Sequence, residues 1–203
     1  MRIDFRGLLP ALLALLLAAC SSTPDTDAGE EGPSFYRYAA NAEMSDAYVS
    51  SSDGALRVLT PHGWRKAVDR QQAPAIVLWL LREDYSASIS FLPMQMDPGL
   101  YLTLKKDGIE AVAKVSLSLK QRTADDSVRV VQPVEQFRVG GRVCAAYEYR
   151  LGSTAPLIRV VVFDSGSRFV ECALYPASPE ITPAENRRLF EVQQSVLASM
   201  VAN

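Results

Sequence analysis

The single histidine and the three cysteines are the side chains of this 203-residue chain that could most readily perform acid–base or nucleophilic chemistry. His62 is the only group whose ordinary pKa lies near neutrality, which suits a general base. It lies in a Pro-His-Gly turn, however, which is more typical of a structural corner than of a catalytic one. No serine lies in the Gly-x-Ser-x-Gly pattern that presents a nucleophile on a sharp turn. The sequence therefore predicts no catalytic residue, and an enzyme such as a hydrolase is the least favoured class of function.

Residues with metal-binding potential are sparse. Three cysteines and one histidine are too few ligands for a structural zinc site of the usual kind. Met94 and Met96 flank Gln95 and could offer thioethers to Cu(I), but adaptable apolar packing is the favoured interpretation. Asp125 and Asp126 could bind a hard cation, but their segment offers no further oxygen ligands, so we interpret them as turn and helix-end residues. We expect no metal and no cofactor.

The N-terminus has the layout of an export signal. Arg2 and Arg6 precede an apolar run over residues 8–19 that only Pro10 interrupts. A helix of this length spans about 18 Å, well short of the ~30 Å hydrocarbon core of a bilayer, so we expect no stable membrane span. Residues 1–19 are therefore predicted to be a signal peptide that is removed.

The apolar run ends in Leu17, Ala18, Ala19 and Cys20, which resembles the lipobox of bacterial lipoproteins. The resemblance implies that Cys20 receives a diacylglyceryl group on its sulfur and an amide-linked chain on its new α-amine. Two or three acyl chains anchor a protein durably, whereas one chain binds a membrane only marginally and reversibly. A plain secretory signal with an incidental cysteine is the alternative.

A sorting signal and a tether follow the predicted lipidation site. Residues 21 and 22 are serines, and the enterobacterial sorting rule that this resembles sends such lipoproteins to the outer membrane. We therefore expect the protein at the periplasmic face of the outer membrane. Residues 20–34 contain four acids and no basic or large apolar residue, which indicates a flexible acidic tether. Residues 35–203 are expected to form one globular domain.

The charge balance excludes one large class of partner. The net charge of −2 and the pI near 5.5 lack the basic footprint that nucleic-acid binding requires. Removal of residues 1–19 takes two of 21 basic and one of 23 acidic residues, which leaves 19 against 22 and a charge of −3. Anionic lipid would not attract such a domain, so the acyl chains must hold it at the membrane.

The first half of the domain predicts short strands and one long helix. Strands are expected over residues 56–60, 76–81 and 87–92, and the last two are continuously apolar, which implies burial on both faces. Residues 100–122 are interpreted as one helix, although alternating serines leave a strand in its C-terminal half as an alternative. The apolar stripe of this helix would be Ile109, Val112, Val115 and Leu119. Residues 35–47 fit either a short helix or an extended lead-in.

The second half predicts an antiparallel meander and a final helix. The strands are expected over residues 128–139, 143–151, 157–163 and 169–175. Gly140 and Gly141 suit the two-residue hairpin in which both residues need positive φ. Thr182, Pro183 and Glu185 combine a capping box with proline at the first helical position. The apolar stripe of the final helix would be Leu189, Val192, Val196 and Met200.

These elements predict an α+β fold. Strands that are apolar on both sides need cover on both faces of their sheet. We therefore expect an antiparallel sheet of about six or seven strands with helices packed on it, and a three-layer α/β/α sandwich is one arrangement that satisfies this requirement.

Cys144 and Cys172 are the pair of thiols left in an oxidising compartment, which would favour a disulfide. The meander predicts otherwise. Pairing of the strands places Cys144 opposite Phe163 and Phe163 opposite Arg168, so Cys172 lies four residues further along and two strands away, roughly 16 Å in total. A disulfide needs Cα atoms within about 7 Å. We predict two buried thiols and no disulfide.

Aromatic side chains are the best candidates for a binding surface. Trp64, Trp79, Tyr85, Tyr101 and Tyr175 include some that should be exposed, and an exposed aromatic cluster would indicate a partner. Trp79 is expected in the core. For the others, the sequence does not separate packing from a partner-facing patch.

The order of elements resembles the fold shared by the photosystem accessory protein PsbP, the Ran-binding protein Mog1 and the bacterial lipoprotein DcrB. The resemblance covers roughly residues 48–200. It depends on a Pro-x-Gly-Trp turn after a leading strand (Pro61, Gly63, Trp64), a hairpin followed by a helix, and a meander with a terminal helix. It implies an accessory or binding protein with no catalytic residues to transfer.

Two functions from different classes follow. The favoured hypothesis is an envelope-anchored, non-enzymatic accessory lipoprotein that binds another envelope protein. The alternative is a small-molecule or lipid carrier with a cavity between sheet and helix. An apolar pocket on the order of several hundred Å³ would favour the carrier, whereas a filled core with an exposed apolar patch would favour partner binding.

Overall fold

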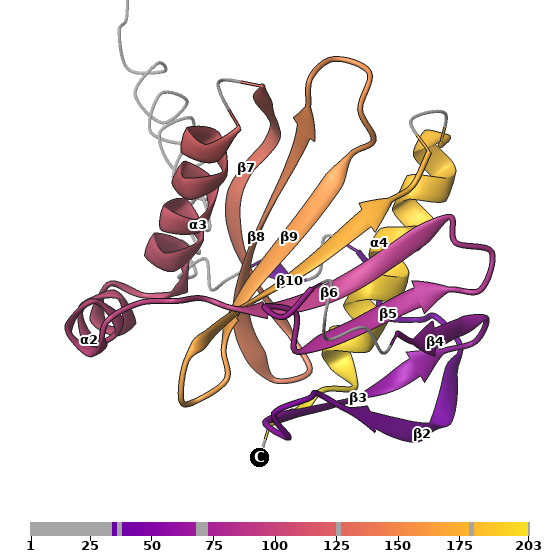
Figure 1. Ribbon diagram of the computed structural model, residues 1–203, viewed down its shortest axis with the longest axis horizontal. Coiled ribbons are helices and arrows are strands. Elements are labelled where there is room, and N and C mark those ends of the chain that lie inside the picture. Colours follow the sequence, from indigo (N-terminus) through magenta and orange to yellow (C-terminus); the bar gives the residue numbers. More distant parts are fainter. Residues whose placement is uncertain (1–33, 36–37, 68–72, 125–126, 179–180, 203) are drawn as a thin grey trace, which may run out of the picture. The chain divides into compact units, whose positions relative to one another are not determined.

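The computed structural model describes residues 34–35, 38–67, 73–124, 127–178 and 181–202 (Figure 1). By its internal contacts the chain divides into two units, Met1–Gly32 and Pro33–Asn203, and the description below concerns the second. The predicted signal peptide, Cys20 and the tether as far as residue 33 lie outside the described residues, and so do Asp125 and Asp126. Among the helices of the described residues, none has the length and hydropathy needed to cross a bilayer.

Most of the described strands form one eight-stranded sheet. In order across the sheet, they are β1 (Ser34–Phe35), β7 (Val128–Val139), β8 (Arg142–Leu151), β9 (Ile158–Asp164), β10 (Phe169–Pro176), β6 (Ala87–Pro93), β5 (Leu78–Arg82) and β4 (Trp64–Lys66). β1 runs parallel to β7, and the seven strands from β7 to β4 are antiparallel throughout. The predicted antiparallel sheet is therefore confirmed.

A second sheet has the order β11–β3–β2. It consists of β2 (Met44–Ser50), β3 (Leu56–Pro61) and β11 (Val201–Ala202). The strand expected over residues 56–60 is present as β3, but it pairs with β2 and β11 and does not join the main sheet. β2 occupies part of the ambiguous segment 35–47. Its register shifts between Met44 and Tyr48, which disrupts the alternation that would have marked a strand.

The predicted meander is confirmed as β7, β8, β9 and β10. β7 and β8 meet at Gly140 and Gly141, whose φ angles of 54° and 78° are those that the two-residue turn requires. A Cβ atom on Gly140 would lie 2.8 Å from the carbonyl oxygen of Ala198 at the end of the last helix, so this turn also needs glycine for space.

The predicted register between β9 and β10 is wrong by two residues. Cys144 lies opposite Phe163, as expected. Phe163, however, lies opposite Val170 and not Arg168. The β9–β10 connection extends over residues 165–168 and is closed by a hydrogen bond from the Ser165 N–H to the Arg168 carbonyl, so it is longer than the predicted pairing of Phe163 with Arg168 allows.

The single helix predicted over residues 100–122 is also wrong. The structure has two helices, α2 (Pro98–Asp107) and α3 (Ile109–Thr123), separated by Gly108. Gly108 has φ 88° and ψ 167°, a conformation that essentially only glycine adopts, so it ends one helix and lets the next begin in a new direction. The alternative of a strand in the C-terminal half fails too, because α3 remains helical to Thr123.

The buried face of α3 differs from the predicted stripe. Its buried residues are Ile109, Val112, Ala113 and Ser116. Leu119, which we placed in the stripe, is 46% exposed. The buried face follows the helical spacing i, i+3, i+4 and i+7. Its last position is Ser116, which is buried because it forms hydrogen bonds. A search for apolar residues at helical spacing does not find such a serine.

The final helix is confirmed as α4 (Pro183–Ala198). Thr182 Oγ1 accepts a hydrogen bond from the Glu185 N–H at 3.2 Å, and Pro183 occupies the first turn. The predicted stripe faces the core, because Leu189, Val196 and Met200 are buried and Val192 packs beside them.

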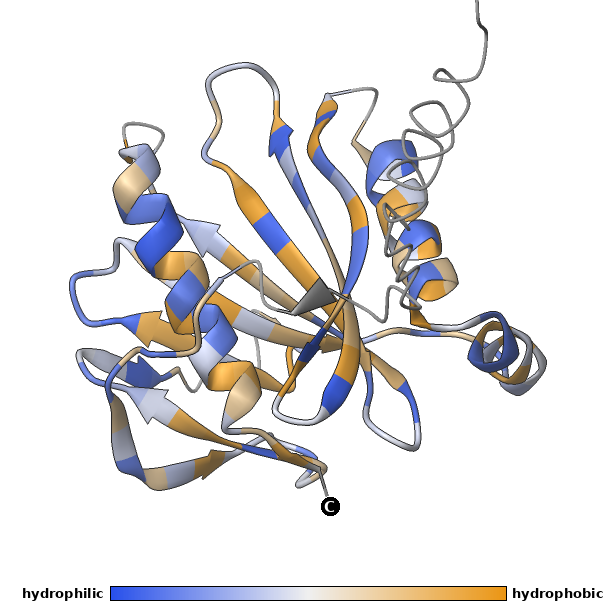
Figure 2. Ribbon diagram, turned by 180° about the vertical axis from the view of Figure 1, so that it is seen from behind, coloured by the Kyte–Doolittle hydropathy of each residue, from blue (hydrophilic) through white to orange (hydrophobic). Residues whose placement is uncertain are grey.

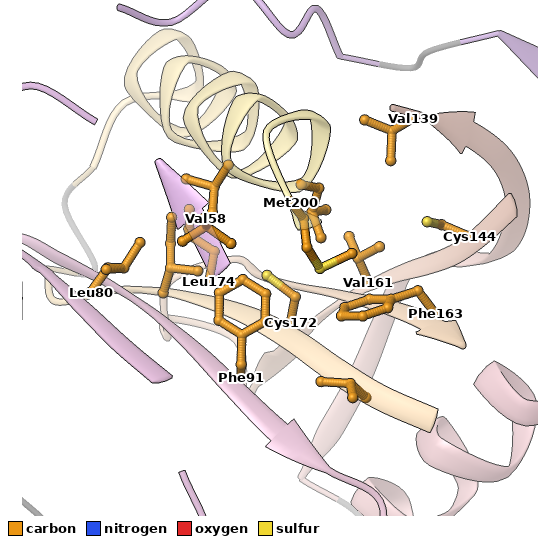
Figure 3. Packing of buried hydrophobic residues seen from close by; sticks show 14 of the residues in the cluster. Val58, Leu80, Phe91, Val139, Cys144, Val161, Phe163, Cys172, Leu174 and Met200 are labelled. Atoms are coloured by element: carbon orange, nitrogen blue, oxygen red, sulfur yellow. The ribbon is translucent and has the colours of Figure 1, made fainter. Parts of the chain in front are cut away.

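The helices cover opposite faces of the main sheet and create two cores. Along β8, Cys144 and Ala146 belong to the core beneath α4, whereas Ala145 and Tyr147 belong to the core beneath α2 and α3. Alternate residues of a strand point to opposite faces, so the centre of the domain is a three-layer α/β/α sandwich. Figure 2 shows α4 lying across its face of the sheet, and Figure 3 shows the apolar side chains packed beneath it. The α+β class is confirmed.

Candidate functional site

His62 lies at the exposed turn between β3 and β4. Its Nδ1 atom is 3.4 Å from Glu43 Oε1, and 55% of its side chain is exposed. It also lines an open groove beside α4 that is described below. The structure therefore places the single histidine next to a surface carboxylate at a turn, the position expected of a structural corner.

Cys144 and Cys172 are buried thiols, and both are unpaired. They lie on the α4 side of the sheet, with their sulfur atoms apart (Figure 3). Cys144 pairs with Phe163, and Cys172 pairs with Val161, so the two cysteines lie two residues and two strands apart. Their Cα atoms are therefore about 12 Å apart, well above the ~7 Å that a disulfide allows. Burial raises the pKa of each thiol to about 12, so neither is a thiolate nucleophile at neutral pH.

The other sequence candidates do not gather into one site. Met94 and Met96 are half-buried and pack against the α3-side core. Trp64 is buried, whereas Trp79 is only half-buried, so its assignment to the core was wrong. The reason is that α3 packs on β7, β8 and β9, and Trp79 lies beyond them on β5. Tyr85 is 63% exposed at the β5–β6 turn, where the Arg65 guanidinium donates to its hydroxyl at 2.6 Å and lies over its ring.

A polar cluster beneath α3 joins the helix to the sheet. Ser116 Oγ donates to Glu171 Oε1 at 2.6 Å and lies 2.6 Å from the Tyr147 hydroxyl, which must then be the donor in that second bond. Lys120 Nζ donates to Glu171 Oε2 at 2.7 Å. Burial, and next the Glu171 charge, raise the pKa of Tyr147. Because Ser116 is fully buried and each of these groups has a partner, the cluster fixes α3 on the sheet.

A second polar cluster, beneath α4, surrounds a buried arginine. Arg159 of β9 is 1% exposed. Its guanidinium carbon lies 4.8 Å from the ring centroid of Tyr38, 5.4 Å from that of Phe137 and 5.9 Å from that of Phe190. Its Nη atoms donate to the side-chain oxygens of Gln193 and Gln194 on α4, at 2.9 and 3.1 Å. Burial lowers the pKa of Arg159 to about 10, so the group remains cationic at neutral pH and is stabilised by the three rings.

Tyr38 connects this arginine to a buried carboxylate. The Tyr38 hydroxyl donates to Glu148 Oε1 at 2.7 Å, and Glu148 lies opposite Arg159 in the register of β8 and β9. The Tyr38 ring also makes an edge contact with Phe190, with centroids 5.2 Å apart. Beside Arg159 and Glu148 there is a recess of about 10 Å³, room for one water molecule. The space around this arginine and carboxylate is therefore nearly filled.

Two larger grooves flank the N-terminal half of α4. The first groove has a volume of about 380 Å³ and the second about 540 Å³. Apolar residues in the first groove are Tyr38, Leu157, Ile181 and Phe190, and those in the second are Trp64, Ala184, Leu189 and Val192. The α4 residues that line the two grooves lie on opposite flanks of the helix, so an exposed ridge of α4 separates the grooves.

The charged side chains that line the grooves are mostly cationic. Arg150 and Arg187 line the first groove, and Arg82 and Arg188 line the second together with His62 and Glu185. Arg187 Nε lies 3.4 Å from Glu191 Oε1, and Arg82 Nη1 lies 3.6 Å from Glu185 Oε1. The Arg150 guanidinium donates to the Ala155 carbonyl. Within the described part of the chain, Arg188 makes no ion pair.

Asn186 adds a buried acceptor to the wall of the first groove. Its side chain is 6% exposed, and its Oδ1 atom has no hydrogen-bond donor among the described residues. A buried amide oxygen without a donor carries a desolvation cost, so a donor brought by a water molecule or a ligand would be stabilising at this position.

Comparison with solved structures identifies the fold. The chain is similar to the solution structure of cyanobacterial PsbP (CyanoP) from Synechocystis sp. PCC 6803, with a TM-score of 0.57, 14% identity, and coverage of 80% of this chain and 94% of that chain. The Saccharomyces cerevisiae Ran-binding protein Mog1p matches with a TM-score of 0.47 and 11% identity over 79% of this chain and 96% of that chain. LpqN, involved in cell envelope biogenesis of Mycobacterium tuberculosis, matches with a TM-score of 0.41 and 12% identity over 78% and 90%.

No family model matches the chain, and neither does any curated protein sequence. At 14% identity the first of these structures shows a PsbP-like fold and nothing about function. The predicted likeness to that fold is confirmed.

The sequence analysis did not identify the polar cluster beneath α4. Arg159 interrupts an otherwise apolar strand, and Gln193 with Gln194 interrupts the core-facing side of α4. Polar residues in such positions signal a buried polar contact, but the pattern does not name the partner. Tyr38 gave no signal, because it belongs to the ambiguous segment and its contacts with Glu148 and Phe190 join it to residues far along the chain.

Proposed function

We propose that the protein is an envelope-anchored, non-enzymatic accessory lipoprotein that binds another envelope protein. In this proposal, acyl chains on Cys20 hold it at the periplasmic face of the outer membrane. The lipobox-like residues that end in Cys20 and the acidic segment 20–34 support an anchor followed by a tether. The PsbP-like fold of the following domain supports a folded unit carried by that anchor.

The observation that favours partner binding over transport is the location of the open space. A carrier needs an apolar cavity between sheet and helix on the order of several hundred Å³. The recess beside Arg159, which residues of β7, β8 and β9 line, holds about 10 Å³. The spaces of 380 and 540 Å³ are grooves on the surface, rimmed by arginines. Surface grooves with apolar floors and charged rims suit contact with another protein.

The chemistry of the polar clusters supports a non-enzymatic role. Ser116 and Glu171 are buried and hydrogen-bonded, and Cys144 and Cys172 are buried thiols whose pKa burial raises. General acid–base or nucleophilic catalysis requires such groups to reach a substrate. His62 is accessible, but it lies at an exposed turn with its Nδ1 atom 3.4 Å from a surface carboxylate oxygen of Glu43.

Crosslinking in intact cells followed by mass spectrometry tests this proposal. We expect the full-length lipoprotein to recover the same envelope protein reproducibly. The Cys20→Ser variant, which cannot be acylated, should lose that partner because it no longer resides at the membrane surface. Failure of the acylated protein to recover any reproducible partner would contradict the proposal.

One observation favours the carrier as a second candidate. The first groove combines 380 Å³ with aromatic and aliphatic side chains, a volume that small ligands occupy. Native mass spectrometry of the lipoprotein purified from membranes distinguishes the two functions. A stoichiometric adduct that is lost on denaturation would favour the carrier, whereas a bare acylated chain would favour partner binding.

A further inference from the structure

We propose that the exposed ridge of α4 and its two flanking grooves, which we name the α4 surface, bind an acidic segment of the partner protein that also carries apolar side chains. The α4 surface comprises the ridge residues Ala184, Arg187 and Arg188 with the residues of the two grooves. This inference rests on the proposed function, because it names the chemistry of the partner.

Charge complementarity is the first argument. The whole chain has a net charge of −2, yet four arginines line the grooves. Two of them have carboxylate partners, because Arg187 lies beside Glu191 and Arg82 lies beside Asp84 and Glu185. Arg188 is exposed and makes no ion pair within the described residues, and Arg150 binds a backbone carbonyl, not a carboxylate. The N-terminus of α4, with its positive end of the helix dipole, lies at the same place. Carboxylates of a partner would therefore find unpaired cations here.

The floor of each groove is the second argument. Tyr38, Leu157 and Phe190 lie in the first groove, and Trp64, Leu189 and Val192 lie in the second. An occupant must therefore bring apolar side chains as well as carboxylates. The Asn186 Oδ1 atom, buried in the wall of the first groove without a donor, would accept an N–H from the occupant.

The arrangement of the grooves favours a polypeptide over a lipid headgroup or a small anion. The two grooves lie on opposite flanks of one helix, and the body of that helix is about 10 Å across. A single headgroup would fill one groove and leave the other open. A polypeptide segment can cross the ridge, place side chains in both grooves and bring several carboxylates to the arginines along its path.

Site-specific crosslinking in intact cells tests this inference with the full-length lipoprotein. The photo-crosslinker p-benzoylphenylalanine replaces Ala184, which is exposed and lines the second groove. It is combined with the double charge reversal Arg187→Glu and Arg188→Glu. The matched control is Arg122→Glu with Arg129→Glu, which makes the same charge change at exposed positions of α3 and β7. Circular dichroism with thermal melting establishes that both double variants fold.

We expect the crosslinked peptide of the partner to be rich in aspartate and glutamate. Its yield should fall by about tenfold or more with Arg187→Glu/Arg188→Glu, because two new like charges face the partner's carboxylates. The control pair should change the yield by less than about twofold, since its charges lie away from the α4 surface.

Five other outcomes would overturn the inference. An unchanged yield with Arg187→Glu/Arg188→Glu would show that these charges do not recognise the partner. An adduct of phospholipid mass would identify a membrane contact, and a crosslink to this same chain would identify a dimer. The crosslinker is also placed at Thr103, a remote exposed position on α2. A partner that is captured only by the crosslinker at Thr103 would overturn the inference and leave the proposed function intact. No partner from either position would overturn both.

Discussion

Tyr38 is the residue that ties the start of the domain to its α4 side. Its ring covers the Arg159 guanidinium, its edge meets Phe190, and its hydroxyl donates to the buried Glu148 carboxylate. A buried cation and a buried carboxylate are costly unless each is compensated, and Tyr38 contributes to both. Because Tyr38 also lines the first groove, its packing shapes the surface that we assign to the partner.

Substitution of Tyr38 should separate these contributions. Tyr38→Phe keeps the ring and removes the donor to Glu148, so we expect a loss of about 1–2 kcal/mol in the free energy of unfolding. Tyr38→Ala removes the ring as well and should cost about 3 kcal/mol. Urea denaturation measures both. Tyr48→Phe, at a 49% exposed tyrosine, is the control and should change stability by less than about 0.5 kcal/mol. Equal effects of Tyr38→Phe and Tyr48→Phe would contradict this account.

The buried thiols predict a dependence of stability on alkaline pH. Burial raises the pKa of Cys144 and Cys172 from 9.0 to about 12, so the folded chain holds these protons more tightly than the unfolded chain. Their contribution to stability is complete below pH 9 and should be lost as pH rises from 9 toward 12. Urea denaturation at several pH values should show this decline, and it should be shallower in the Cys144→Ala/Cys172→Ala variant. An equally steep decline in that variant would assign the effect to other groups, such as the buried tyrosines.

Gly108 decides the shape of the helical layer at the scale of elements. It separates α2 from α3 at φ 88° and ψ 167°, and a Cβ atom there would meet no neighbour within 4 Å. The requirement for glycine is therefore conformational and not steric. Leu104 of α2 and Ile109 of α3 both reach the same core across this break, so the turn places both helices on the sheet.

Gly108→Ala should therefore destabilise the domain through its backbone alone. We expect a loss of about 1–3 kcal/mol, the usual cost of holding a non-glycine residue in this region of φ and ψ. Thr103→Ala, at an exposed position of α2, should change stability by less than about 0.5 kcal/mol. Chemical denaturation measures both variants. A Gly108→Ala protein as stable as the Thr103→Ala protein would show that the break is not a conformational requirement.

The elements that could be predicted from sequence are those with a local signal. The meander follows from Gly140–Gly141 and from long apolar strands, and α4 follows from Thr182–Pro183 and its stripe. β2 was missed because a register shift interrupts its alternation, and β11 is only two residues long. The α4 surface could not be found, because Tyr38, Arg82, Arg150 and Arg188 come from four separate segments that only the fold brings together.

Charge is distributed unevenly over the whole molecule. The chain is acidic, whereas most of the charged side chains that line the two grooves beside α4 are arginines. Such asymmetry steers an acidic partner toward one side of the domain. We therefore expect binding of the partner to weaken as salt rises from about 0.1 M to 1 M, since the screening length falls from about 10 Å to 3 Å. Titration of the purified lipoprotein with the partner that crosslinking identifies, at several salt concentrations, measures this affinity. An affinity that does not depend on salt would contradict the expectation.

Acylation of Cys20 is the central claim for the whole molecule, because it fixes where the domain resides and which partners it meets. The most direct test is mass spectrometry of the N-terminal peptide of the protein purified from membranes. The account predicts a chain that begins at Cys20 and carries a diacylglyceryl group with an amide-linked fatty acid. A mature N-terminus without fatty acid, or a Cys20→Ser protein that still sediments with membranes, would contradict it.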